Sequence, residues 1–174
     1  LFIENNGQYE GKNWNSQKEI HFAYHQNPFY IFFNTKGMTY RLDKIVKNPA
    51  RKKDPKVLPK RTNISELIDI EWLGSNDDVE ILAEGKESYD YHFMQRTEEG
   101  KRNYKQINAA AYHKITYKNL YDNIDVEYLL HPEGGVKYNI ILHPGADPNQ
   151  IRLKYSSAHT NVGDEKIEVT LDKN

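Results

Sequence analysis

The chain has 174 residues, 37% of them hydrophobic and 13 of them Tyr, which suits one folded domain with a core of ordinary size. The absence of Cys excludes a disulfide scaffold, Cys-ligated zinc and thiol chemistry, and no stretch reaches the roughly 18 uncharged apolar residues of a membrane span. The formal net charge of −1 argues against a generally basic nucleic-acid binder, so we expect no nucleic-acid partner.

Alternation of apolar and polar residues is the main pattern along the chain, and it predicts about ten short strands. In chain order, the ranges with this pattern are 20–25, 29–33, 38–42, 64–73, 79–83, 89–94, 113–120, 124–130, 136–142, 151–155 and 167–171. The clearest pair is 124–130 and 136–142, because the turn sequence Pro-Glu-Gly-Gly at 132–135 joins them as a hairpin. No stretch of similar length has the period of a helix. We therefore expect an all-β fold, an antiparallel β-sandwich rather than a barrel, as a single domain over residues 1–174.

A basic segment interrupts the alternation. Residues 41–61 contain nine basic and two acidic residues and three Pro, a net charge of +7, so the other 153 residues carry −8. Since Pro and like charges disfavour regular structure, residues 47–62 are predicted to be a long, exposed, basic insert that follows the 38–42 strand. Its cations are candidates for binding a polyanion or an acidic polysaccharide: Arg51, Lys52, Lys53, Lys56, Lys60 and Arg61. The alternatives are a solvated loop without a ligand and a loop that docks on the acidic remainder of the chain.

The sequence contains none of the local catalytic motifs: no G-x-S-x-G, no Walker A, no G-x-G-x-x-G and no H-E-x-x-H. The seven His are scattered, and His21 and His25 are too far apart on one strand to share a metal ion. The oxygen-rich turn at 122–125 could hold calcium, with Asp122 and Asp125 as candidate ligands, although plain turns use the same residues. We assign no catalytic residue and expect no cofactor.

Six blocks of sequence, in this order, resemble one known family. They are Phe2-Ile3-Glu4-Asn5-Asn6-Gly7-Gln8, Gly37-Met38-Thr39-Tyr40, Glu71-Trp72-Leu73-Gly74, Tyr117-Lys118-Asn119-Leu120-Tyr121-Asp122-Asn123-Ile124-Asp125, Lys137-Tyr138 and His143-Pro144-Gly145-Ala146-Asp147-Pro148. Together they resemble the N-terminal domain of unknown function in large secreted Bacteroidetes proteins. Those proteins often carry β-propeller repeats and end in a type IX secretion or gliding-motility-associated C-terminal domain. The basic insert departs from the family, whose members usually have a shorter connection there.

The resemblance implies export to the cell surface or the medium, with a signal peptide removed before Leu1, and an accessory domain rather than a known enzyme. We favour a non-catalytic interaction module of a secreted, multidomain, adhesin-like protein. Its expected partners are downstream domains of the same chain, a surface polysaccharide or another surface protein. The alternative is a carbohydrate-binding module, which needs an exposed groove with aromatic side chains. A glycosidase or peptidase is less expected, and a glycosidase would need a carboxylate pair at catalytic separation.

Overall fold

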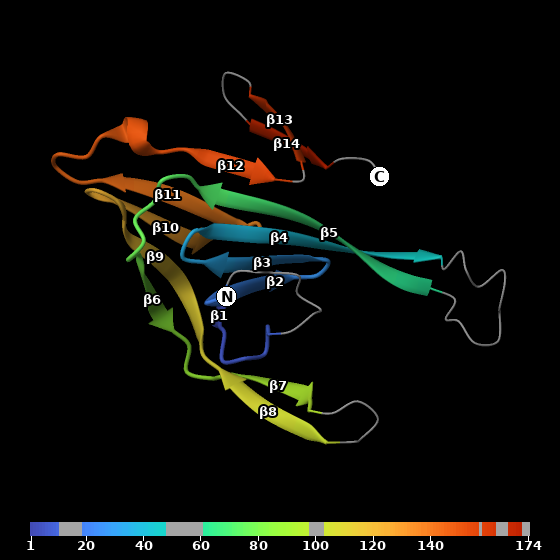
Figure 1. Ribbon diagram of the computed structural model, residues 1–174. Coiled ribbons are helices and arrows are strands. Elements are labelled where there is room, and N and C mark those ends of the chain that lie inside the picture. The colour runs from blue at the N-terminus through green and yellow to red at the C-terminus, as the bar shows by residue number, and fades with distance from the viewer. Residues whose placement is uncertain (11–18, 48–60, 98–102, 157, 163–166, 172–174) are drawn as a thin grey trace.

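The computed structural model describes residues 1–10, 19–47, 61–97, 103–156, 158–162 and 167–171 (Figure 1). Most of these residues lie in strands. The strands of the large sheet are β1 (Phe2–Glu4), β2 (Phe22–Gln26), β3 (Phe29–Asn34), β4 (Gly37–Lys47), β5 (Arg61–Trp72), β6 (Glu80–Lys86), β9 (Ala111–Tyr121), β10 (Ile124–Leu130), β11 (Val136–Leu142) and β12 (Leu153–Ser156). Two smaller sheets pair β7 (Tyr91–Arg96) with β8 (Tyr104–Ala109) and β13 (Ala158–Val162) with β14 (Ile167–Leu171).

The large sheet is antiparallel and curled. Its strand order is β11-β10-β9-β1-β2-β3-β4-β5-β12, and β6 pairs with β9 outside this path. The two end strands, β11 and β12, are joined by a connection that includes the short 3₁₀ helix η2 (Pro148–Gln150), but they do not pair with each other. The prediction of an antiparallel all-β fold is confirmed, and the curl makes it sandwich-like, or a half-barrel (Figure 1). Among the described residues, the structure contains no helix that could span a membrane.

The main core fills the inside of the curl, where alternate side chains of the strands meet. Two hydrogen bonds between side chains and distant strands cross this core. Trp72 of β5 donates its indole N–H to the hydroxyl of Tyr128 on β10 at 3.0 Å. The hydroxyl of Tyr117 on β9 donates to the carbonyl oxygen of Asn34 at 2.8 Å. The two halves of the curled sheet are therefore held together by directional contacts as well as by apolar burial.

A second, smaller cluster lies on the outer face of β2 and β3. It consists of Tyr9, Ile20, Ala23 and Phe32, and Phe93 of β7 packs against it. The ring centroids of Tyr9 and Phe93 are 5.8 Å apart in an edge-to-face arrangement. Both faces of these two strands are thus covered, which leaves their ends and turns as the places where a ligand could approach.

β4 and β5 extend beyond the body of the sheet as a two-stranded ribbon (Figure 1). They pair along their whole length, from Gly37 opposite Glu71 to Lys47 opposite Arg61. β3, in contrast, pairs with β4 only up to Leu42. The ribbon corrects the predicted boundaries: residues 43–47 belong to β4, and 61–62 begin β5 rather than end the insert.

The physical reason for the longer strands is local. Ile45, Val46 and Ile64 are β-branched, which favours extended backbone. Across the ribbon, the Lys44 ammonium lies 2.6 Å from the Glu66 carboxylate, so part of the positive charge is paired. The remainder of the predicted insert, residues 48–60, lies outside the described residues.

Candidate functional site

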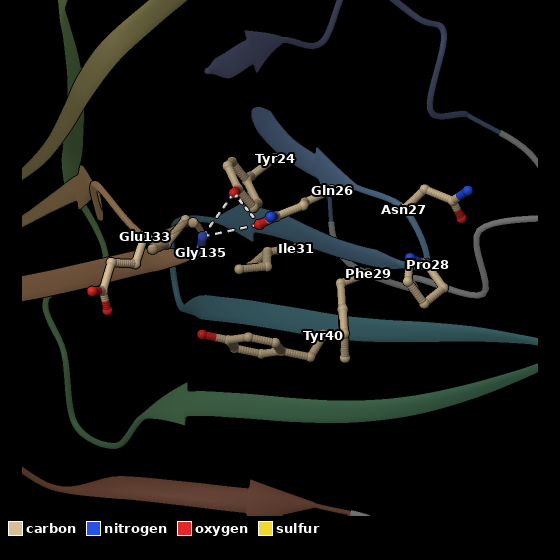
Figure 2. A pocket seen from close by; sticks show the side chains of 11 residues that line it. Tyr24, Gln26, Asn27, Pro28, Phe29, Ile31, Tyr40, Glu133 and Gly135 are labelled. Atoms are coloured by element: carbon tan, nitrogen blue, oxygen red, sulfur yellow. Dashed lines mark hydrogen bonds between the residues drawn. The ribbon is translucent and has the colours of Figure 1, made fainter.

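A hollow of about 500 Å³ lies between the β2–β3 turn and the β10–β11 loop (Figure 2). Its volume falls within the range of small-molecule sites. Its lining comes from three places in the fold: the turn and adjoining parts of β2 and β3, one residue of β4, and the loop that leads into β11. The lining residues are Tyr24, Gln26, Asn27, Pro28, Phe29, Ile31, Tyr40, Glu133, Gly134, Gly135 and Val136.

A small hydrogen-bond network holds the β10–β11 loop against β2. The Tyr24 hydroxyl donates to Oε1 of Gln26 at 2.7 Å. The Gly135 N–H lies 2.9 Å from the Tyr24 hydroxyl and 3.0 Å from the same Gln26 oxygen. Figure 2 shows this triangle of contacts at one side of the hollow. The network fixes the relative position of two segments that are more than 100 residues apart in sequence.

Gly134 is favoured by its backbone conformation and by the same close approach. A Cβ atom at this position would lie 2.6 Å from Nε2 of Gln26, closer than side chains tolerate, and its φ of +95° is one that L-residues rarely adopt. Gly134 therefore does more than turn the chain. It lets the loop pass directly over the Gln26 amide and so forms one wall of the hollow.

The floor of the hollow is apolar and its rim is polar. Ile31 and the ring of Tyr24 are buried, Tyr40 and Val136 are half-buried, and Phe29 exposes 49% of its surface. Among the described residues, no hydrogen-bond partner contacts Nε2 of Gln26, the Tyr40 hydroxyl or the Glu133 carboxylate. Burial raises the pKa of Tyr40, so its hydroxyl keeps its proton at neutral pH and can donate it in a hydrogen bond.

The charges in the hollow are few. Of its described lining residues, Glu133 alone carries a carboxylate, and none is His, Lys or Arg. General acid–base catalysis by the usual two-carboxylate or carboxylate–His arrangements needs a second such group nearby. The arrangement offers aromatic faces, amide and hydroxyl groups and one negative charge, a combination suited to holding a ligand.

The predicted calcium candidates have different surroundings from those of a cation site. The side chain of Asp125 is only 5% exposed and contacts the Lys118 ammonium, while His143 Nε2 lies 2.9 Å from it. It also accepts the N–H of Asn119 at 2.8 Å. Burial alone would raise the pKa of Asp125, but the hydrogen bonds from its three neighbours lower it to about 2.

Asp125 is thus a carboxylate already surrounded by donors. The side chain of Asp122, in contrast, is exposed at the turn, where Nδ2 of Asn76 lies 3.5 Å from it. Within the described part of the chain, no group of three or more His, Asp or Glu side chains is placed to hold a metal ion. The carboxylate of Asp125, on β10, therefore links β9 to the segment that starts at His143.

The structure describes only one residue of the predicted polyanion patch. Arg61 is exposed at the start of β5, opposite Lys47. The other five members, Arg51, Lys52, Lys53, Lys56 and Lys60, lie outside the described residues. The patch therefore stays a prediction from sequence.

Sequence reasoning did not single out the hollow. The turn at 132–135 was predicted only as a hairpin connection, and Phe29 only as the first residue of the predicted strand 29–33. One available signal was position: Phe29 lies at the end of its strand, directly after two turn residues, where an aromatic side chain extends past the core.

Comparison with protein families matches residues 2–173 to a domain of unknown function (DUF7948). No curated protein matches the chain, and no solved structure matches it. The match covers nearly the whole sequence, so it includes both the curled sheet and the hollow.

Proposed function

The chain belongs to the DUF7948 family of domains of unknown function, and from that premise we propose that it is a non-catalytic binding module of a larger exported protein. In this role the curled sheet is a rigid frame, and the hollow between the β2–β3 turn and the β10–β11 loop takes the ligand. The partner is a surface polysaccharide or a surface protein, met outside the cell.

The hollow is the observation that supports binding. Its floor is made of rings and aliphatic side chains, and Gln26, Tyr40 and Glu133 supply polar groups without partners among the described residues. A single carboxylate is poorly suited to acid–base chemistry but well suited to orienting a ligand. The likeness of the sequence blocks to secreted Bacteroidetes proteins supports the export and the adhesin-like setting.

A carbohydrate-binding module is the more specific form of this proposal. It is favoured by Phe29, which is half exposed in the hollow although it is a large apolar side chain. Aromatic faces that remain accessible in a partly polar hollow are typical of binding sites.

The proposal is tested in the natural host with the complete protein. Antibodies against residues 1–174 should label intact cells, and a gene that lacks only these residues should give cells that still export the protein but attach less to surfaces. Labelling restricted to permeabilised cells would contradict export. Unchanged attachment would contradict a role in adhesion.

A further inference from the structure

We infer that the hollow binds a neutral sugar residue within an oligosaccharide. This inference rests on the proposed function as a non-catalytic binding module, and it names the chemical class of the ligand. Four features of the hollow carry it: two neighbouring rings, three polar groups without partners among the described residues, the absence of a cation from the described lining, and a floor whose strands are paired on both sides.

The rings come from adjacent strands and share one face of the sheet. Phe29 of β3 is paired with Leu42, and Ile31 is paired with Tyr40 of β4, so Phe29 and Tyr40 are diagonal neighbours on that face. Figure 2 shows both side chains next to Ile31. The C–H groups on one face of a sugar ring are apolar and weakly positive, which suits contact with the negative face of an aromatic ring.

The polar groups at the rim complement hydroxyl groups. Nε2 of Gln26 can only donate a hydrogen bond, the Glu133 carboxylate can only accept one, and the Tyr40 hydroxyl can do both. A sugar hydroxyl both donates and accepts, so the hydroxyl groups of an oligosaccharide can pair with groups of each of these kinds.

The charge of the lining selects against acidic ligands. A uronic acid, a sulfated sugar or a phosphate would bring a negative charge towards Glu133, and none of the described lining residues is a cation that could compensate for it. The basic residues of 41–61 are a separate feature, since none of the described lining residues comes from this segment.

An extended peptide is disfavoured at the floor of the hollow because the strands there have no free edge. Tyr24, Ile31 and Tyr40 each have a strand partner on both sides, so the main-chain groups of this part of the sheet are already used. In the loop, the Gly134 N–H donates to the carbonyl oxygen of His131 at 2.9 Å, and the Gly135 N–H is held by Tyr24 and Gln26. Recognition at the floor of the hollow and at Gly134 and Gly135 therefore depends on side chains, as recognition of a sugar does.

The experiment is a titration of the isotopically labelled 174-residue chain with defined oligosaccharides, followed by NMR and calorimetry. The neutral probes are the hexasaccharides of cellulose, xylan, mannan and chitin, and the acidic probe is hexagalacturonate. We expect at least one neutral probe to bind with a Kd between about 0.1 and about 1 mM and to shift the signals of the lining residues. Hexagalacturonate should bind at least about tenfold more weakly.

Two variants and a matched control locate the binding. Phe29→Ala should weaken binding about tenfold, because it removes one stacking face. Glu133→Gln should still bind the neutral probe, and the difference in Kd between the neutral and the acidic probes should become smaller. Leu142→Ala is the control, since Leu142 is exposed to the same 49% as Phe29 but lies on β11 away from the lining, and it should change nothing.

The outcomes separate this inference from the proposed function. If no neutral probe shifts the lining residues, or if Phe29→Ala binds as well as the parent chain, the sugar site is wrong, and the binding-module role still depends on the attachment test in cells. If a probe binds but mass spectrometry finds it cleaved, the non-catalytic role is wrong and the sugar site stands.

Discussion

At the scale of single residues, Asp125 shows how one buried charge organises a junction. It connects Lys118 and Asn119 of β9 with His143 beyond β11, so one carboxylate joins segments on either side of two strands. Such a group stabilises the fold only while it is ionised, because protonation replaces an acceptor with a donor. Asp125 is also one of the two calcium candidates of the sequence, and in the structure its described partners are Lys118, Asn119 and His143.

This arrangement predicts a specific pH dependence. The pKa of Asp125 falls from 3.8 in the unfolded chain to about 2 in the folded one, so its contribution is complete above about pH 4 and is lost as the pH falls through 2. Asp125→Asn should lower the free energy of unfolding at pH 7 by about 2 kcal/mol. The difference from the parent chain should shrink towards zero near pH 2, as measured by urea denaturation across this range.

Asp122→Asn is the matched control for this experiment. It removes an exposed carboxylate from the same turn and should change stability little at any pH. A cost of Asp125→Asn that stays constant from pH 7 to pH 2 would mean that the charge of Asp125 is not what stabilises the junction.

At the scale of the element, alternation of apolar and polar residues predicted the strands in which it is regular. It did not predict strands that are very short or mostly polar. The pair 124–130 and 136–142 matches β10 and β11 because apolar and polar residues alternate throughout and a turn sequence joins them. β1 has only three residues, and β8 buries only Ile107 and Ala109 among polar neighbours, so neither has a pattern of its own. These two strands are defined by their partners in the sheet.

The hollow could not be predicted for a related reason. Its walls come from the β2–β3 turn and the β10–β11 loop, and the contact between Tyr24 and Gly135 spans 111 positions in sequence. No local sequence pattern predicts a contact between segments so far apart. The sequence identified the second of these turns, and only the curl of the sheet brings it over the first.

The β4–β5 ribbon gives a prediction at this scale. Because Lys47 and Arg61 are paired opposite each other, replacing residues 48–60 with Asn-Gly should close the ribbon with a tight turn. We expect the shortened chain to fold with a midpoint of thermal unfolding within a few degrees of the parent chain, as followed by circular dichroism. A loss of cooperative unfolding would show that residues 48–60 are part of the fold rather than an insert.

At the scale of the whole molecule, the near-neutral net charge is the sum of a positive and a negative region of the sequence. Residues 41–61 carry +7 and the remainder −8, so the chain has a large charge asymmetry although its sum is −1. A separate contact with a polyanion is therefore compatible with a hollow that prefers neutral ligands.

Retention on a heparin column tests this asymmetry. We expect the parent chain to bind at low salt and to elute as the salt concentration rises, because contacts with a polyanion release counterions. The chain shortened by residues 48–60 loses five cations and should elute at clearly lower salt. Elution of both chains at the same salt concentration would exclude the basic segment as a polyanion site. Both chains contain the same curled sheet, so a difference between them comes from residues 48–60.

The place of β1 in the sheet has a consequence for the order of folding. β1 lies between β2 and β9, so it joins two meanders, β2 to β5 on one side and β9 to β11 on the other. During synthesis it can pair with β2 early, but its second neighbour begins only at Ala111. Closing that long loop is entropically slow, so we expect the docking of β9 on Phe2 and Ile3 to be the late step that completes the sheet. Three residues at the start of the chain thus connect a sheet that would otherwise be two.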